Sequence, residues 1–186
     1  KTKINLIISP NGFGHFRRLN TIIDIIDLQR FDVTIFTDKD AISRFHKRIK
    51  LNLSKEIKIK NVPNLPISLD YQVKTSNKIL DIFNFIDDFD KDSLIISDNY
   101  PEVFKFKDNG ILLANFFWHK EISKFIDDKS YNFINSPKKR FITLGTIFSK
   151  SYIKSLKNFS QIGLFGNKKV SAPKKNNRIL FVQGKG

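Results

Sequence analysis

The residues best placed to do chemistry stand in a Gly-rich segment near the start of the chain, Asn11-Gly12-Phe13-Gly14-His15-Phe16-Arg17-Arg18. A β-rich apolar run precedes this segment, and an apolar helical pattern begins directly after it. The two glycines allow a sharp turn and a close approach of the backbone to a ligand. The helix start offers free N–H groups and a positive dipole end, which attract anions. We therefore expect a ligand site here, with Asn11, Gly12 and Gly14 among its binding residues.

His15 is the candidate proton acceptor of this segment. Its place at a helix start favours the neutral imidazole at pH 7, the form that a general base needs. A structural role at the helix start is the alternative.

Two arginines, Arg17 and Arg18, follow in the first helical turn, where a cation is electrostatically unfavourable. One or both could be there to meet an anion, and a solvated surface position is the alternative for Arg18. We assign substrate binding to Arg17.

Two common nucleotide-binding motifs do not fit this segment. A dinucleotide fingerprint needs a third glycine where Arg17 stands, although Asp38 ends the second apolar run where a ribose-binding acid would lie. A P-loop needs Gly-Lys-Ser/Thr, and here His15 follows Gly14. The pattern that remains is Gly-x-Gly-His-x-x-Arg.

Short apolar runs alternate with helical patterns along the chain, which predicts an α/β fold with a doubly wound parallel sheet. The period-two run Glu56–Val62 indicates a strand with one wet face near the sheet edge. Buried helix faces are predicted from Leu19, Ile22, Ile23 and Ile26, and again from Ile79, Ile82, Phe83 and Ile86. The expected strands are Lys3–Ser9, Phe31–Thr37, Glu56–Val62, Leu94–Ser97, Gly110–Asn115, Phe141–Leu144 and Gln161–Phe165.

Asp98 directly follows the fourth expected strand. If the strand order is 3-2-1-4-5, the first and fourth strands are neighbours at the point where ligands bind in such sheets. Asp98 should then lie beside His15, where a carboxylate that accepts from one imidazole nitrogen would fix the tautomer. A turn or helix-cap role before Pro101 is the alternative for Asp98.

The chain divides into three parts by composition. We expect residues 1–166 to form one domain and residues 167–177, which are polar, basic and Pro-bearing, to form a linker. Residues 178–186 begin again as a strand and a Gly-rich turn, so we expect them to open a second domain that is truncated here.

The chain has 33 Lys and Arg residues against 18 Asp and Glu residues, a formal net charge of +15. This excess favours anionic partners such as phosphorylated small molecules, lipid head groups or nucleic acid, with compositional drift as the alternative. The sequence contains no recognised nucleic-acid-binding motif, so we expect no specific nucleic acid. The absence of Cys excludes disulfides and Cys-based zinc sites. Asp88-Phe89-Asp90 fits a solvated helix end, and no metal site is predicted.

No apolar run approaches the roughly 18 residues that a membrane-spanning helix needs. We therefore expect a cytoplasmic protein, with peripheral contact to an anionic inner membrane face as a further option.

The Gly-x-Gly-His-x-x-Arg motif, with the segments Ile95–Glu102 and Gly110–Trp118, resembles the N-terminal domain of GT-B fold glycosyltransferases. The UDP-glycosyltransferases and the lipid-linked N-acetylglucosaminyltransferase of cell-wall synthesis belong to that group. The sugar-nucleotide hydrolase of pseudaminic acid biosynthesis is a relative. The resemblance implies that residues 1–166 are the acceptor-side, Rossmann-like domain and that residues 178–186 begin a donor-binding domain.

The activity implied is metal-independent transfer of a sugar from a nucleotide-sugar donor to a hydroxyl, with no cofactor besides the donor. The acceptor could be a sugar, a lipid-linked molecule or a small molecule. The resemblance makes His15 the base and Asp98 its partner, with Asn115 on a sugar hydroxyl and Trp118 on a sugar face. Core packing is the alternative for Trp118. This chain alone should be nearly inactive.

Two other functions stay open. One is a sugar-nucleotide hydrolase or epimerase on the same architecture. The other is a non-enzymatic basic domain that binds nucleic acid or anionic surfaces.

Overall fold

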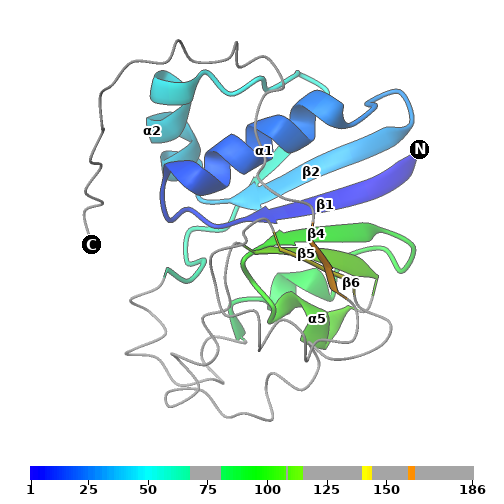
Figure 1. Ribbon diagram of the computed structural model, residues 1–186. Helices are drawn as coiled ribbons and strands as arrows, with labels where there is room; N and C mark the ends of the chain where they lie inside the picture. The colour runs from blue at the N-terminus through cyan, green and yellow to red at the C-terminus, as the bar shows by residue number, and fades with distance from the viewer. Residues whose placement is uncertain (68–80, 108, 115–139, 144–158, 162–186) are drawn as a thin grey trace, which may run out of the picture.

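The computed structural model describes residues 1–67, 81–107, 109–114, 140–143 and 159–161, and Figure 1 shows their arrangement. The described elements alternate between strand and helix over most of their order. They are β1 (Thr2–Ile8), α1 (Phe13–Ile25), β2 (Phe31–Thr37), α2 (Lys39–Ile49), β3 (Lys58–Asn61), the 3-10 helix η1 (Asn84–Ile86), β4 (Leu94–Asp98), α5 (Val103–Phe106), β5 (Gly110–Ala114), β6 (Arg140–Thr143) and β7 (Phe159–Gln161).

The strands form one sheet in the order β3-β2-β1-β4-β5-β6-β7, and every neighbouring pair is parallel. The predicted parallel α/β sheet is therefore confirmed, as is the adjacency of the first and fourth strands. The winding direction reverses between β1 and β4, so their carboxyl ends flank the topological switch point of the sheet.

Helices cover both faces of the sheet, as Figure 1 shows, with α1 and α2 on one face and α5 and η1 on the other. Alternate residues of β1 separate the two cores: Leu6 and Ile8 pack under α1 and α2, whereas Ile7 packs with η1 and α5. All three of these β1 side chains are fully buried. The described part of the chain has the Rossmann-like arrangement.

The predicted buried face of the first helix matches α1. Leu19, Ile22 and Ile23 are buried and Ile26 packs against the same core, while Ile25 points away and is 71% exposed. The predicted edge strand also matches, because β3 lies at the end of the sheet with Lys58 and Lys60 exposed.

Two predicted elements differ from the structure. The helix predicted to carry Ile79, Ile82, Phe83 and Ile86 is still helical at Asp81, but the chain then continues as the 3-10 turn Asn84–Ile86. Phe83 and Ile86 are buried, as predicted, and residues 68–80 lie outside the described residues. The last strand was predicted at Gln161–Phe165 and lies at Phe159–Gln161, where it pairs with β6; residues 162–165 lie outside the described residues.

Several sequence predictions fall on residues that the structure does not describe. These are the proposed binding residues Asn115 and Trp118, the linker 167–177 and the strand expected in 178–186. None of the described helices is long and apolar enough to cross a membrane.

Gly110, the first residue of β5, has no room for a side chain. A Cβ atom there would lie 2.5 Å from Cε1 of Phe104 and 2.9 Å from the main-chain oxygen of Ile95. Since a main-chain atom cannot move aside cheaply, Gly110→Ala should lower the free energy of unfolding by about 1–3 kcal/mol. Gly14→Ala is the matched control, because its Cβ would have a nearest neighbour at 3.8 Å and should cause no loss. Urea denaturation measures both, and equal stability of the two variants would contradict this packing.

Candidate functional site

The start of α1 is built by the turn Ser9–Gly12 at the carboxyl end of β1. The Gly12 N–H donates to the Pro10 carbonyl at 3.0 Å, and the Asn11 N–H donates to the Ser9 hydroxyl at 3.3 Å. Gly12 has φ +105°, a conformation that L side chains rarely adopt, so the chain needs glycine here. No side chain caps α1, and its first turn holds no acidic residue. The first N–H groups of α1 therefore lack a side-chain acceptor from the cap residue.

Asp98 reaches the same place from the sheet. It is the last residue of β4 and pairs in register with Ile8, the last residue of β1. Because paired residues of parallel strands point to the same face, Asp98 shares the α1 face with Ile8. The alternative of a turn or helix-cap residue before Pro101 is wrong, since Asp98 lies within β4 and its carboxylate bonds His15 and Arg18.

The chain leaves β4 through a tightly bonded turn that fixes the end of the strand. Asn99 adopts a left-handed conformation with φ +69°, and its N–H donates to the Leu113 carbonyl at 2.8 Å. The Ser97 hydroxyl donates to the Tyr100 carbonyl at 2.8 Å, and the Tyr100 hydroxyl donates to the Pro66 carbonyl at 2.7 Å. These bonds hold the strand end that carries Asp98.

Three side chains meet at this point: His15, Arg18 and Asp98. Nδ1 of His15 lies 2.8 Å from Oδ2 of Asp98. The Arg18 guanidinium donates through Nε at 3.1 Å and through Nη2 at 2.7 Å, both to Oδ1 of Asp98. Nη2 of Arg18 also lies 2.8 Å from Nδ1 of His15. The carboxylate thus divides its two oxygens between a permanent cation and an imidazole.

The two contacts of His15 Nδ1 compete, because one ring nitrogen cannot donate to Asp98 and accept from Arg18 at once. Oδ2 of Asp98 is buried and has His15 as its partner within the described residues, whereas Arg18 keeps its two bonds to Oδ1. An unpaired buried carboxylate oxygen costs more than one unpaired N–H of a guanidinium that has other partners. We therefore assign the neutral-ring proton to Nδ1, which leaves the lone pair on Nε2.

The His15 side chain is 15% exposed, so the ring is mostly enclosed and still reachable from outside. An imidazole with Nδ1–H bonded to a carboxylate and with Nε2 free has the form of a general base, in which the carboxylate stabilises the imidazolium after proton uptake. The arrangement can therefore take a proton from a hydroxyl or from water.

Of the two arginines expected to meet an anion, Arg18 is the one that contacts a carboxylate, that of Asp98. Its side chain is 9% exposed and belongs to the cluster, so the predicted alternative of a solvated surface position is wrong. Arg17, predicted to bind substrate, is exposed, and its main-chain carbonyl accepts from the Thr21 hydroxyl at 3.1 Å. The helical spacing held the missing information: Arg18 lies four residues before the buried Ile22, on the same face of α1.

The other proposed binding residues differ in what the structure says of them. Asn11 and Gly14 are exposed beside the cluster, and Gly12 is half-buried in the turn. Asp38, which stands where a ribose-binding acid would lie, caps α2 instead: its carboxylate accepts from the N–H groups of Asp40 at 2.7 Å and Ala41 at 3.4 Å.

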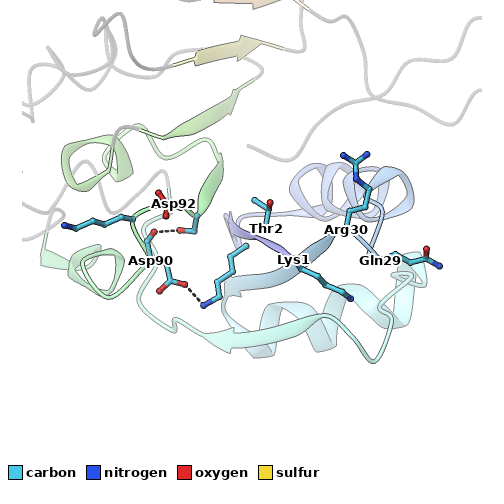
Figure 2. A pocket seen from close by; sticks show the side chains of 9 residues that line it. Lys1, Thr2, Gln29, Arg30, Asp90 and Asp92 are labelled. Carbon is cyan, nitrogen blue, oxygen red and sulfur yellow. Dashed lines mark hydrogen bonds and ion pairs between the residues drawn. The ribbon is translucent and has the colours of Figure 1, made fainter.

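An open groove of about 930 Å³ lies at the opposite, amino-terminal edge of the sheet. Figure 2 shows Asp90 and Asp92 on one wall and Gln29 with Arg30 on the other. The Lys3 ammonium pairs with Asp90, which raises the pKa of Lys3 and lowers that of Asp90. Because these charges neutralise each other and the groove lies away from the carboxyl ends of the strands, we do not place the functional site there.

Nothing in the described part of the chain suggests a metal centre. No group of three or more His, Asp and Glu side chains in that part could hold an ion. Asp88 and Asp90 are exposed beside Phe89, whose ring packs 4.7 Å from that of Phe36, so the two carboxylates flank a core aromatic residue.

The buried ion pair should behave as a unit in unfolding experiments. Asp98→Leu leaves a cation enclosed without its partner, and we expect a loss of about 3–5 kcal/mol in the free energy of unfolding. Arg18→Met should cost a similar amount, because it leaves the buried carboxylate without its cation, with His15 as its remaining partner among the described residues. The double variant should recover most of the loss, which urea denaturation of all four proteins measures as a coupling energy. Losses that simply add in the double variant would contradict the pairing.

In comparisons with known proteins, no protein-family model matches this chain and no curated protein sequence matches it.

Proposed function

We propose that this chain is the acceptor-side part of a GT-B type glycosyltransferase in which His15 is the general base. The observation that carries the proposal is the 2.8 Å contact between His15 Nδ1 and Asp98 Oδ2 at the switch point of the sheet. The sequence resemblance in the Gly-rich turn supports it, and so does the 15% exposure of the His15 side chain, which keeps the ring reachable from outside.

The proposed reaction uses the groups in a fixed order. An acceptor hydroxyl gives its proton to Nε2 of His15 while its oxygen forms a bond to the anomeric carbon of the donor sugar. The bond from that carbon to the diphosphate oxygen breaks, and the nucleoside diphosphate leaves with the electron pair. Asp98 stabilises the imidazolium through Nδ1–H, as a carboxylate does in triad-like arrangements. Direct displacement of this kind inverts the configuration at the anomeric carbon.

The uncapped start of α1 supports an anionic substrate. Its first turn carries no acidic side chain, and Asn11 and Gly14 are exposed there. Free N–H groups at a helix start attract phosphate and carboxylate groups. A nucleotide-sugar donor or a phosphorylated acceptor fits that chemistry.

Hydrolysis or epimerisation of a sugar nucleotide is the second enzymatic candidate. A water molecule placed at Nε2 of His15 would give hydrolysis with the same base. Release of nucleoside diphosphate from nucleotide sugars without an acceptor would favour hydrolysis, and release that needs an acceptor would favour transfer.

His15→Gln should lower the turnover of the full-length protein by about 10²–10⁴-fold, because the ring no longer takes the proton. The assay is nucleoside diphosphate release from a panel of nucleotide sugars with and without hydroxyl acceptors. His46→Gln is the matched control, since His46 is exposed on α2 and should leave turnover unchanged. Near-normal turnover of His15→Gln would rule out the role of His15, and no release from any donor would rule out the proposed activity.

A non-enzymatic candidate, binding to an anionic surface, is favoured by one observation: the charge of the chain is unevenly distributed in the fold. Residues 39–60, which form α2, β3 and their connection, hold eight Lys and Arg against two Asp and Glu, and all eight basic side chains are exposed. Residues 81–107, on the other side of the sheet, hold three Lys against seven Asp and Glu. A basic surface of this kind attracts anionic lipid head groups or nucleic acid.

Flotation with vesicles that contain phosphatidylserine tests the basic surface. If the surface binds, Arg44→Glu/Lys47→Glu should weaken association by roughly 30-fold or more, at about 1 kcal/mol for each charge. Lys91→Glu/Lys105→Glu makes the same charge change with exposed residues of the 81–107 region and should have little effect. Equal flotation of the two double variants would contradict a specific surface, and competition by duplex DNA would point to nucleic acid instead.

A further inference from the structure

We propose that Arg18 is a positioning residue, which directs His15 to Oδ2 of Asp98 and prevents the ring from keeping the proton that it takes up. The inference rests on the proposed function of His15 as a base. It starts from the contact of a nine-tenths buried guanidinium with both other members of the cluster.

Arg18 determines which carboxylate oxygen is open to the imidazole. Its Nε and Nη2 groups both donate to Oδ1, at 3.1 and 2.7 Å, so Oδ1 is occupied by two charge-assisted bonds. Oδ2 is the oxygen left for Nδ1 of His15, at 2.8 Å. Without Arg18, the Asp98 carboxylate could rotate, and Nδ1–H of His15 could bond either of its oxygens. The imidazole ring would then lose its fixed orientation.

Arg18 also balances the charge around the ring. Among the described residues, the charged groups that touch the His15 ring are Asp98 from β4 and Arg18 from α1. From α2, the ring of Phe45 packs on Phe13 and Phe16, the neighbours of this site. The Arg48 guanidinium of α2 lies over the Phe13 ring, 5.4 Å from its centroid. Asp98 favours a second proton on the ring, whereas a cation at 2.8 Å opposes it.

The opposing charges of Asp98 and Arg18 around His15 suit a base that must release its proton in every turnover. A histidine beside a buried carboxylate alone would hold its second proton strongly. With the Arg18 cation beside the carboxylate, the cluster is neutral before proton uptake and positive after it. Proton transfer onward to solvent is then not blocked by an overly stable ion pair.

Nitrogen NMR of the imidazole rings tests the proposal without any substrate. In ¹⁵N-labelled protein, the His15 signals are assigned by their loss in His15→Gln. In the wild type we expect the proton of the neutral ring on Nδ1 and the lone pair on Nε2. In Arg18→Gln, the doubly protonated ring should persist to a pH higher by about one to two units, the usual size of a close charge effect.

Two further variants separate this role from a structural one. Arg17→Gln removes a cation from the same helical turn, but one that is exposed, and should leave the titration and the tautomer of His15 unchanged. Arg18→Lys keeps the cation and should keep the titration near the wild type. It lacks the two-pronged contact with Oδ1, so the single tautomer should become a mixture. If Arg18→Gln does not fold, Arg18→Lys still decides the positioning role through the tautomer.

The proposal is overturned if the His15 titration in a folded Arg18→Gln protein stays in place or moves to lower pH, or if Arg18→Lys retains a single Nδ1–H tautomer. Failure of the proposed function looks different: the NMR results would be as expected while His15→Gln keeps its turnover. In active protein, the acidic limb of the pH–rate profile of Arg18→Gln should shift in the same direction as the NMR titration.

Discussion

The Asp98 carboxylate has no contact with solvent, so both of its oxygens must find donors inside the protein. The donors are His15 and Arg18, and their spacing of three residues puts both on the face of α1 that meets β4. The contact therefore fixes the rotation of α1 about its axis and its height along the sheet. The turn at Gly12, the pairing of Ile8 with Asp98 and the left-handed residue Asn99 all serve to keep these groups in place.

Much of the architecture was predictable because it depends on local patterns. The continuous apolar runs of β1, β2 and β4 predict strands that are covered on both faces of the sheet. The alternating pattern of β3 predicts a strand with one face in water, near the edge of the sheet. These requirements are visible in the sequence itself. The pairing of the first and fourth strands follows from the handedness of crossovers, and this is what brought Asp98 near His15 in the prediction.

The parts that were not predictable depend on contacts between distant segments. At the 3-10 turn Asn84–Ile86, Phe85 stacks on the distant Phe36, and Phe83, just before the turn, packs on Tyr100. Arg18 is a different case. An anion partner and a solvated surface position were both open for it, and the helical phase relative to Ile22 indicates the buried side. A buried arginine needs a carboxylate partner, and a buried aspartate needs a cation or other donors. Predicting that Arg18 is buried therefore also predicts a nearby carboxylate, which Asp98 provides.

The edge of the sheet at β3 has a consequence for handling the protein. An unpaired strand exposes N–H and C=O groups that can add a strand of another molecule, which is a common route to aggregates. Among the described strands, β3 ends the sheet and is short. Lys58 pairs with Asp32 at 3.1 Å, so the exposed Lys60 is the residue of β3 that would bring like charges together if two copies met along this edge. High salt screens such repulsion. Low ionic strength should therefore keep the β3 edges of concentrated protein apart, and high salt should bring them together.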